Sequence, residues 1–121
     1  MDCLFCKIAN NEIASYTIFE DEKVKCFLDI NPDNNGHLLI IPKQHFTNLD
    51  DISEAVFLDI FKTSQKMKKL LEKKLNCDGL VLTQNNGSPQ EVKHFHVHLI
   101  PYYDKAEPLK SLEEITTKLT Q

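Results

Sequence analysis

Three of the five histidines of the chain stand two residues apart, in the stretch His94-Phe95-His96-Val97-His98. Successive side chains of an extended strand point to opposite faces, so the three imidazoles share one face and Phe95 and Val97 share the other. The apolar face fits a core, which leaves a row of imidazoles on the open face. Such a row is typical of a metal site, a nucleophile with helper groups, or an exposed pH-sensitive patch.

A cysteine pair near the N-terminus offers a second place for a metal. Neighbouring positions on one strand face lie about 6.6 Å apart, so two imidazoles of the row could share an ion but three would be strained. The pattern Cys3-x-x-Cys6 has the spacing of one half of a structural zinc site. Two further ligands would come from His37, His45 or one end of the row. A metallohydrolase with zinc on the row itself is therefore the weaker alternative.

The elements that position these residues follow from the pattern of apolar side chains. A short helix or turn is expected at residues 3–11, followed by strands at 16–19, 24–29, 37–42, 80–83 and 92–101. One long amphipathic helix is expected from an Asp51-x-x-Glu54 start to a stop at 76–79, and a weak helix at 111–120. Turn residues at 31–36 predict an antiparallel pair of the strands on either side. The fold class predicted from this pattern is α+β.

Composition limits the classes of partner. The 121 residues, 41% of them hydrophobic, predict a single domain, 1–121, with one core. All fourteen basic residues are Lys against eighteen acidic residues, so we expect no nucleic-acid polymer as partner and no bidentate Arg clamp for phosphate. The apolar runs are far shorter than the roughly 20 residues that span a bilayer, so no membrane partner is expected. No signal or transit peptide is recognisable, and the expected location is cytoplasmic.

Several stretches of the sequence resemble one known family. His94 to Ile100 reads His-φ-His-φ-His-φ-φ, where φ is apolar, and resembles the signature of the histidine triad (HIT) nucleotide-binding family. Four other stretches resemble that family in the expected order: Cys3 to Ile8, Phe27 to Ile30, Gly36 to His45 and Asn85 to Gly87. The resemblance covers roughly residues 2–103, leaving a polar tail at 104–121, and points to the Hint-like, zinc-bearing bacterial branch. It implies a sheet of about five antiparallel strands, one long helix, a short N-terminal helix and a homodimer.

The resemblance also implies a reaction. His96 would attack the α-phosphorus of a purine nucleotide and carry the nucleotidyl group, because a neutral imidazole is a good nucleophile near pH 7. His98 would contact phosphate and bridging oxygen, and His37 would sit behind the triad and help to orient it. The implied activity is hydrolysis of the P–N bond of a nucleoside phosphoramidate. The alternatives are a dinucleoside polyphosphate hydrolase and a non-catalytic nucleotide-binding protein of the same fold.

Binding residues and metal ligands are implied in the same way. The nucleotide-binding residues would be Ile13, Phe27 and Ile30 around the base, Asp29 at the ribose hydroxyls, and Asn85 and Gln90 facing phosphate. The zinc ligands would be Cys3, Cys6, His45 and His94, a closed structural set that ties the N-terminus to the last strand. No catalytic metal is expected, because hydrolysis through a histidine adduct does not require one.

The loop ahead of the triad departs from the family pattern. It is about two residues shorter than in most relatives, and Pro89 stands where a glycine is usual. Proline has no backbone N–H, so one amide contact to phosphate is lost. Glu91 follows where several relatives have a small or hydroxyl residue, and its carboxylate repels phosphate unless it points away or pairs with Lys93. Substrate preference is the property that these departures affect most.

Overall fold

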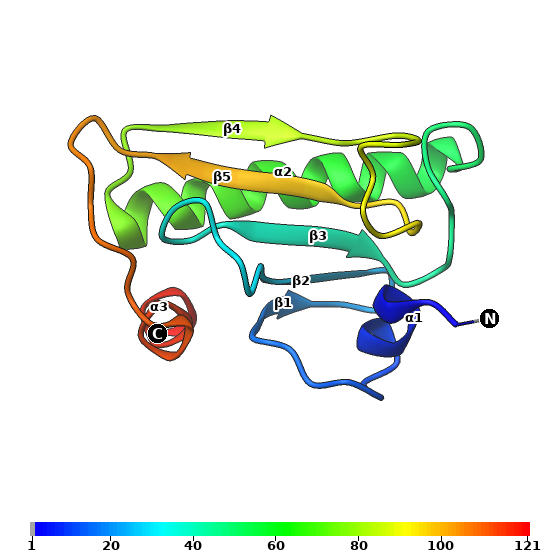
Figure 1. Cartoon of the computed structure of the whole chain (residues 1–121), viewed down its shortest axis with the longest axis horizontal. Coiled ribbons are helices and arrows are strands. Elements are labelled where there is room, and N and C mark those ends of the chain that lie inside the picture. The colour runs from blue at the N-terminus through cyan, green and yellow to red at the C-terminus, as the bar shows by residue number, and fades with distance from the viewer. Residues whose placement is uncertain (1) are drawn as a thin grey trace.

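A computed structural model describes residues 2–121 as one antiparallel sheet with helices packed against it (Figure 1). In chain order the elements are α1 (Leu4–Ala9), β1 (Thr17–Glu20), β2 (Val24–Leu28), β3 (Leu38–Pro42), α2 (Glu54–Leu75), β4 (Gly79–Thr83), β5 (Val97–Tyr102) and α3 (Leu112–Thr120). The strand order is β1-β2-β3-β5-β4, and each neighbouring pair is antiparallel. The predicted α+β fold, with five strands, a long helix and a short N-terminal helix, is confirmed.

The central strands separate two apolar layers. Cys26 and Ile40 face the larger core, which is covered by α2, while their neighbours Phe27, Leu39 and Ile41 face a smaller core under α1. This division follows from strand alternation, because both faces of β2 and β3 carry buried side chains. The short helix α1 is therefore a cover over one face of the sheet.

The residue that caps the start of the long helix is Ser53, two residues after the predicted Asp51. The hydroxyl oxygen of Ser53 accepts the N–H of Val56 and caps α2. The carboxylate of Asp51 instead accepts the N–H of Thr47 and shapes the preceding turn. The predicted stop is confirmed, since Asn76 ends the helix in the left-handed conformation with a φ of 54°.

The last strand is shorter than the predicted 92–101. β5 begins only at Val97, because the backbone ahead of it bonds to a loop and not to a strand: the N–H of Phe95 donates to the carbonyl of Phe46 at 2.7 Å. The predicted alternation nevertheless holds through this segment. Phe95 and Val97 lie in the core under α2, and the histidines lie on the opposite side.

Two other segments complete the frame of the site. Gly36, with a φ of 89°, closes the loop between β2 and β3, where a Cβ would lie only 2.5 Å from a side-chain atom of Leu75. In α3, Ile115 and Leu119 are buried in the larger core. Within residues 2–121, no helix has the length and apolar character needed to cross a membrane.

Candidate functional site

His96 lies immediately ahead of β5 with its ring between the sheet and α1. The side chain is only 5% exposed, and Phe5 of α1 packs edge-on against it with ring centroids 5.0 Å apart. The expectation of an open face is therefore wrong for His96, and also for His94, which has no exposed surface. Strand alternation correctly predicted the face on which the histidines lie, but it could not predict that α1 covers this face.

A backbone carbonyl fixes the tautomer of His96. Its Nδ1 lies 2.7 Å from the carbonyl oxygen of His94, which can only accept a hydrogen bond. Nδ1 must therefore carry the proton, and Nε2 holds the lone pair. Burial lowers the pKa of His96 below the ordinary value of 6.5, with this hydrogen bond opposing the shift. The ring is neutral near pH 7 and presents one unprotonated nitrogen.

A second chain of hydrogen bonds orients His98. The backbone N–H of Asp33 donates to Nδ1 of His37 at 3.0 Å, so the proton of the neutral His37 ring sits on Nε2. That nitrogen lies 3.0 Å from Nδ1 of His98 and 3.5 Å from a carboxylate oxygen of Asp29. His98 thus accepts at Nδ1 and carries its own proton on Nε2. Burial lowers the pKa of both rings, which favours these neutral forms.

The tautomer of His37 also determines whether its Nε2 could bind a metal ion. Asp29, His37 and His98 bring one ligand atom each within 4.8 Å of one another, as a metal site would require. For Nε2 of His37 to bind a metal, its proton would have to move to Nδ1, where it would face the N–H of Asp33. Two donors would then oppose each other. The trio is a hydrogen-bonded relay and a poor metal site.

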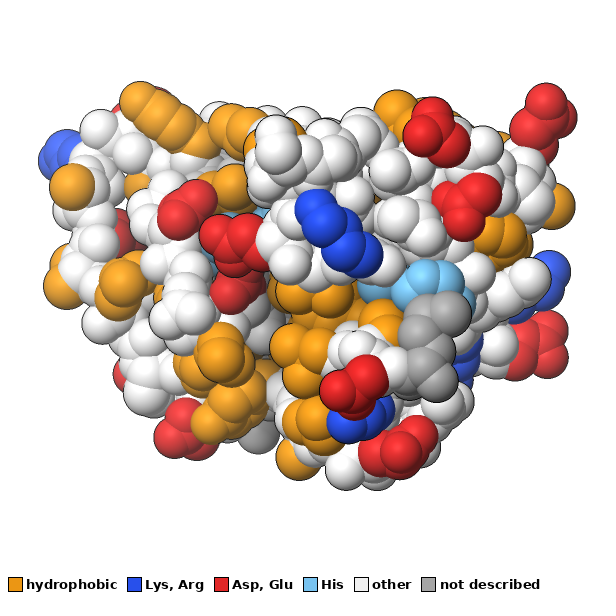
Figure 2. Space-filling view, turned by 45° about the vertical axis from the view of Figure 1, so that its right-hand side comes forward, with side chains coloured by type: hydrophobic (Ala, Val, Ile, Leu, Met, Phe, Trp, Pro, Cys, Tyr) orange, Lys and Arg blue, Asp and Glu red, His pale blue; other side chains and the backbone are white. Residues whose placement is uncertain are grey.

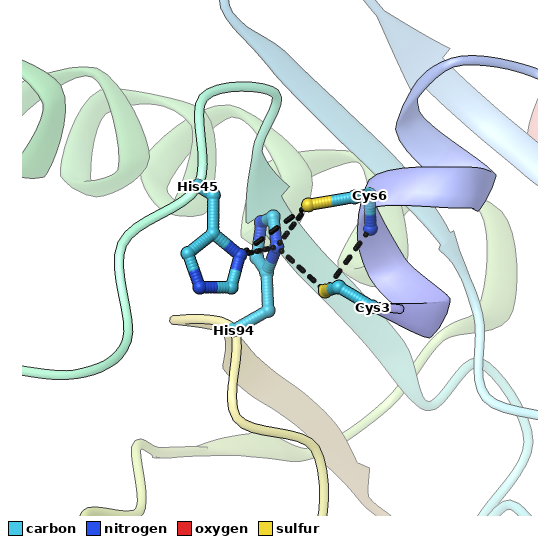
Figure 3. Close-up of side chains that lie close together, drawn as sticks. All are labelled: Cys3, Cys6, His45 and His94. Atoms are coloured by element: carbon cyan, nitrogen blue, oxygen red, sulfur yellow. Dashed lines mark hydrogen bonds between the residues drawn. The ribbon is translucent and has the colours of Figure 1, made fainter. Parts of the chain in front are cut away.

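A second cluster, by contrast, has its ligand atoms free to bind a metal ion (Figure 3). It consists of Cys3, Cys6, His45 and His94. The Sγ–Nδ1 distances between cysteines and histidines are 3.3, 3.4 and 3.5 Å, and the two Nδ1 atoms lie 3.2 Å apart. The bond lengths of zinc to sulfur and nitrogen imply tetrahedron edges of about 3.3 to 3.6 Å between such ligands. The four side chains therefore fit a tetrahedral zinc ion.

Local hydrogen bonds orient these ligands toward one another. Sγ of Cys3 accepts the N–H of Cys6 and caps α1, which places the two thiols on the same side of its first turn. Nε2 of His94 lies 2.8 Å from the carbonyl oxygen of Pro42 and must donate to it, so Nδ1 turns a lone pair into the cluster. Burial raises the pKa of Cys6 to about 11. A cation would supply the charge that stabilises its thiolate.

A cavity of about 650 Å³ opens beside the histidines of the triad. Of the expected site residues, those that line it are Ile13, Phe27, Asp29, Ile30, His37, Asn85, His96 and His98. In the space-filling view, acidic and hydrophobic side chains border a hollow on this face, with small areas of histidine surface visible in it (Figure 2). The structure thus gathers apolar, hydrogen-bonding and nucleophilic groups around one space.

Gln90 does not join this set. Its side chain is buried, its Nε2 donates to the carbonyl of Thr47 at 2.6 Å, and it is not among the residues that line the cavity. The expected contact of Gln90 with phosphate has no support from this position. Conversely, Phe5 and Ile8 of α1 line the cavity, although they are not among the expected site residues. Their place depends on how α1 docks, which no local pattern reveals.

Comparisons with known proteins identify the family of this chain. Residues 10–105 match the family model described as the HIT domain. The chain belongs to the HIT family. It is 44% identical over 104 residues to an uncharacterized HIT-like protein, MJ0866, of Methanocaldococcus jannaschii, covering 84% of this chain and 80% of that one. It is 41% identical over 109 residues to the adenosine 5'-monophosphoramidase HNT1 of Saccharomyces cerevisiae, covering 88% of this chain and 66% of that one.

A solved structure bears on the metal cluster of this HIT protein. The chain is similar to a Zn-bound histidine triad family protein from Mycobacterium smegmatis, with a TM-score of 0.91 and 29% identity, covering 99% of this chain and 91% of that one. The four-ligand cluster of the present chain has the donor types and spacing that zinc requires. The neighbour and the cluster together support zinc binding by this HIT protein.

The cluster predicts which substitutions remove the metal. The double variant Cys3→Ser, Cys6→Ser should lose zinc, because hydroxyls replace both thiolates, whereas Cys77→Ser should keep it, since Cys77 lies outside the cluster. Elemental analysis of purified, dialysed proteins, with circular dichroism to verify folding, measures the outcome. Zinc that stays bound in the folded double variant would place the metal on other residues and contradict the assignment.

Proposed function

We propose that this HIT protein is a nucleotide-binding hydrolase that cleaves the P–N bond of purine nucleoside phosphoramidates through a nucleotidyl adduct on His96. The observation that carries the proposal is the hydrogen bond from Nδ1 of His96 to the carbonyl of His94. It leaves the lone pair on Nε2 of a neutral ring that lines the cavity. The likeness to a relative named adenosine 5'-monophosphoramidase adds independent support.

Two steps account for the reaction. In the first, the lone pair of His96 Nε2 forms a bond to the α-phosphorus while the P–N bond of the N-protonated substrate breaks, so that the leaving group departs as a neutral amine and Nε2–H of His98 donates a hydrogen bond to the phosphate. In the second, water attacks the phosphorus, breaks the bond to His96 and gives its proton to solvent, which releases the nucleoside monophosphate. The relay from Asp33 through His37 prepares His98 for this role, because it keeps the proton on the outer nitrogen.

The remaining groups hold the substrate in the proposed complex. Phe27 and the two partly or largely exposed isoleucines, Ile13 and Ile30, would sandwich the base. Asp29 would accept the ribose hydroxyls, and Asn85 would donate to phosphate. Zinc on Cys3, Cys6, His45 and His94 would be structural: it would anchor α1 to the segment ahead of β5.

The nucleophile can be tested directly. His96→Ala should lower the release of AMP from adenosine 5'-phosphoramidate by at least about 10³-fold, because no other lone pair is placed to attack. Zinc content and the affinity for AMP, measured by calorimetry, should stay close to those of the parent, since the metal ligands and the base slot remain. Turnover that survives in a variant with unchanged zinc would refute the histidine adduct.

We also propose that the chain forms a homodimer through β4. Among the described residues, β4 is hydrogen-bonded to a neighbour on one side only, and its side chains Val81 and Leu82 are 49% and 51% exposed. An unpaired edge with apolar side chains is a template for a second strand. Pairing β4 with its symmetry mate would join two five-stranded sheets into one.

Light scattering coupled to gel filtration measures the state of assembly. The parent should show about twice the chain mass of 14.0 kDa. Leu82→Lys should shift the protein toward the monomer, because a charge would be buried at the edge, whereas Leu109→Lys, at an exposed loop position, should not. A parent mass near 14.0 kDa would contradict the dimer.

A further inference from the structure

The cavity carries an unusual charge for a site that is to hold a phosphate. Three carboxylates line it, those of Asp29, Asp33 and Glu91, and none of the described lining residues is a lysine. Burial lowers the pKa of His98, and these three carboxylates oppose that shift, which means that their charge reaches the ring. The electrostatic environment of His98 is therefore negative.

Glu91 differs from the two aspartates in position. Asp29 and Asp33 belong to the turn after β2, beside His37. Glu91 belongs to the loop between β4 and β5, together with Asn85 and Pro89, which line the same cavity. If the nucleoside occupies the side of Phe27 and Asp29, the group on the far side of the phosphorus extends toward the loop of Glu91.

The nearest candidate partner in sequence does not neutralise Glu91. The ammonium group of Lys93 donates to the carbonyl oxygens of Gly87 and Gln90, each at 2.6 Å. Within residues 2–121, no ion pair joins Glu91 to a basic side chain at 4.0 Å or less. Its carboxylate is exposed and remains available to a ligand.

We infer that Glu91 is a specificity-determining residue that selects substrates whose leaving amine carries a second, positively charged group. The inference rests on the proposed function and adds the chemical class of the leaving group. A cationic leaving group would pair with Glu91, whereas a polyphosphate would bring several negative charges toward it. The same carboxylate therefore favours cationic phosphoramidates and disfavours dinucleoside polyphosphates.

Two matched substrates isolate this effect. Both are adenosine 5'-phosphoramidates of a five-carbon amine, one ending in an ammonium group and the other in a hydroxyl group. For the parent, kcat/KM should be several-fold to roughly tenfold higher for the cationic substrate at low salt, the size expected for one partly solvated charge pair. The preference should shrink as salt is added, because the ions screen the pair.

Glu91→Gln should bring the ratio of the two kcat/KM values close to one and increase the relative rate on a diadenosine polyphosphate. Glu22→Gln is the matched control: it removes the same charge at an exposed site that does not line the cavity, and should keep the parental ratio. Glu91→Asp should retain part of the preference.

The outcomes separate the two proposals. Equal preference in the parent and in Glu91→Gln, with both substrates hydrolysed, would overturn the role of Glu91 and leave the phosphoramidate activity standing. A parent that hydrolyses neither substrate would overturn the proposed function, and the inference with it. A preference that is lost in Glu91→Gln and insensitive to salt would point to packing, and would also contradict selection by charge.

Discussion

The hydrogen bond from Nδ1 of His96 to the carbonyl oxygen of His94 is the contact on which the site depends. It is short, buried and local, and it sets which nitrogen of the central ring holds the lone pair. His94 serves two purposes through different atoms, because its carbonyl orients His96 while its ring belongs to the Cys/His cluster. Backbone carbonyls thus set two of the tautomers, those of His94 and His96, and the amide of Asp33 sets a third.

The helix α1, which covers His96, is held in place at both ends. The first turn of α1 carries the two cysteines, and the ammonium of the buried Lys25 donates to the carbonyl of Ile8 and to Asn11 at the other end. A buried charge is tolerated only where such partners satisfy it, so Lys25 fixes the end of a helix of six residues. Phe5 lies between these anchors and packs on His96. The Cys/His cluster and one wall of the cavity therefore share the same short helix, α1.

Periodicity predicted what depends on backbone geometry. Two-residue spacing placed Phe95 and Val97 in the core and the histidines opposite, and the apolar spacing of α2 located the long helix. Periodicity failed where contacts between distant residues determine the structure. β5 begins later than predicted because Phe95 donates to the carbonyl of Phe46, and α1 covers the face that was predicted to be open. The cysteine spacing gave half of the metal cluster and left His37, His45 or one end of the histidine row as candidates for the rest, and only the resemblance selected His45 and His94. The side chain of Gln90 is buried, where its amide donates to the carbonyl of Thr47, and no local sequence pattern predicts this contact.

The hydrogen bonds of His96 fix its tautomer, and the protonation of its ring nitrogens can be measured. Nitrogen NMR of the isotopically labelled, zinc-loaded protein near neutral pH, assigned with His96→Ala, reads the protonation of each ring nitrogen directly. We expect His96 to be neutral, with its proton on Nδ1 and an unprotonated Nε2, and His98 to be neutral with its proton on Nε2. A His96 ring with the proton on Nε2, or charged at neutral pH, would have no lone pair toward the cavity and would rule out attack by this ring.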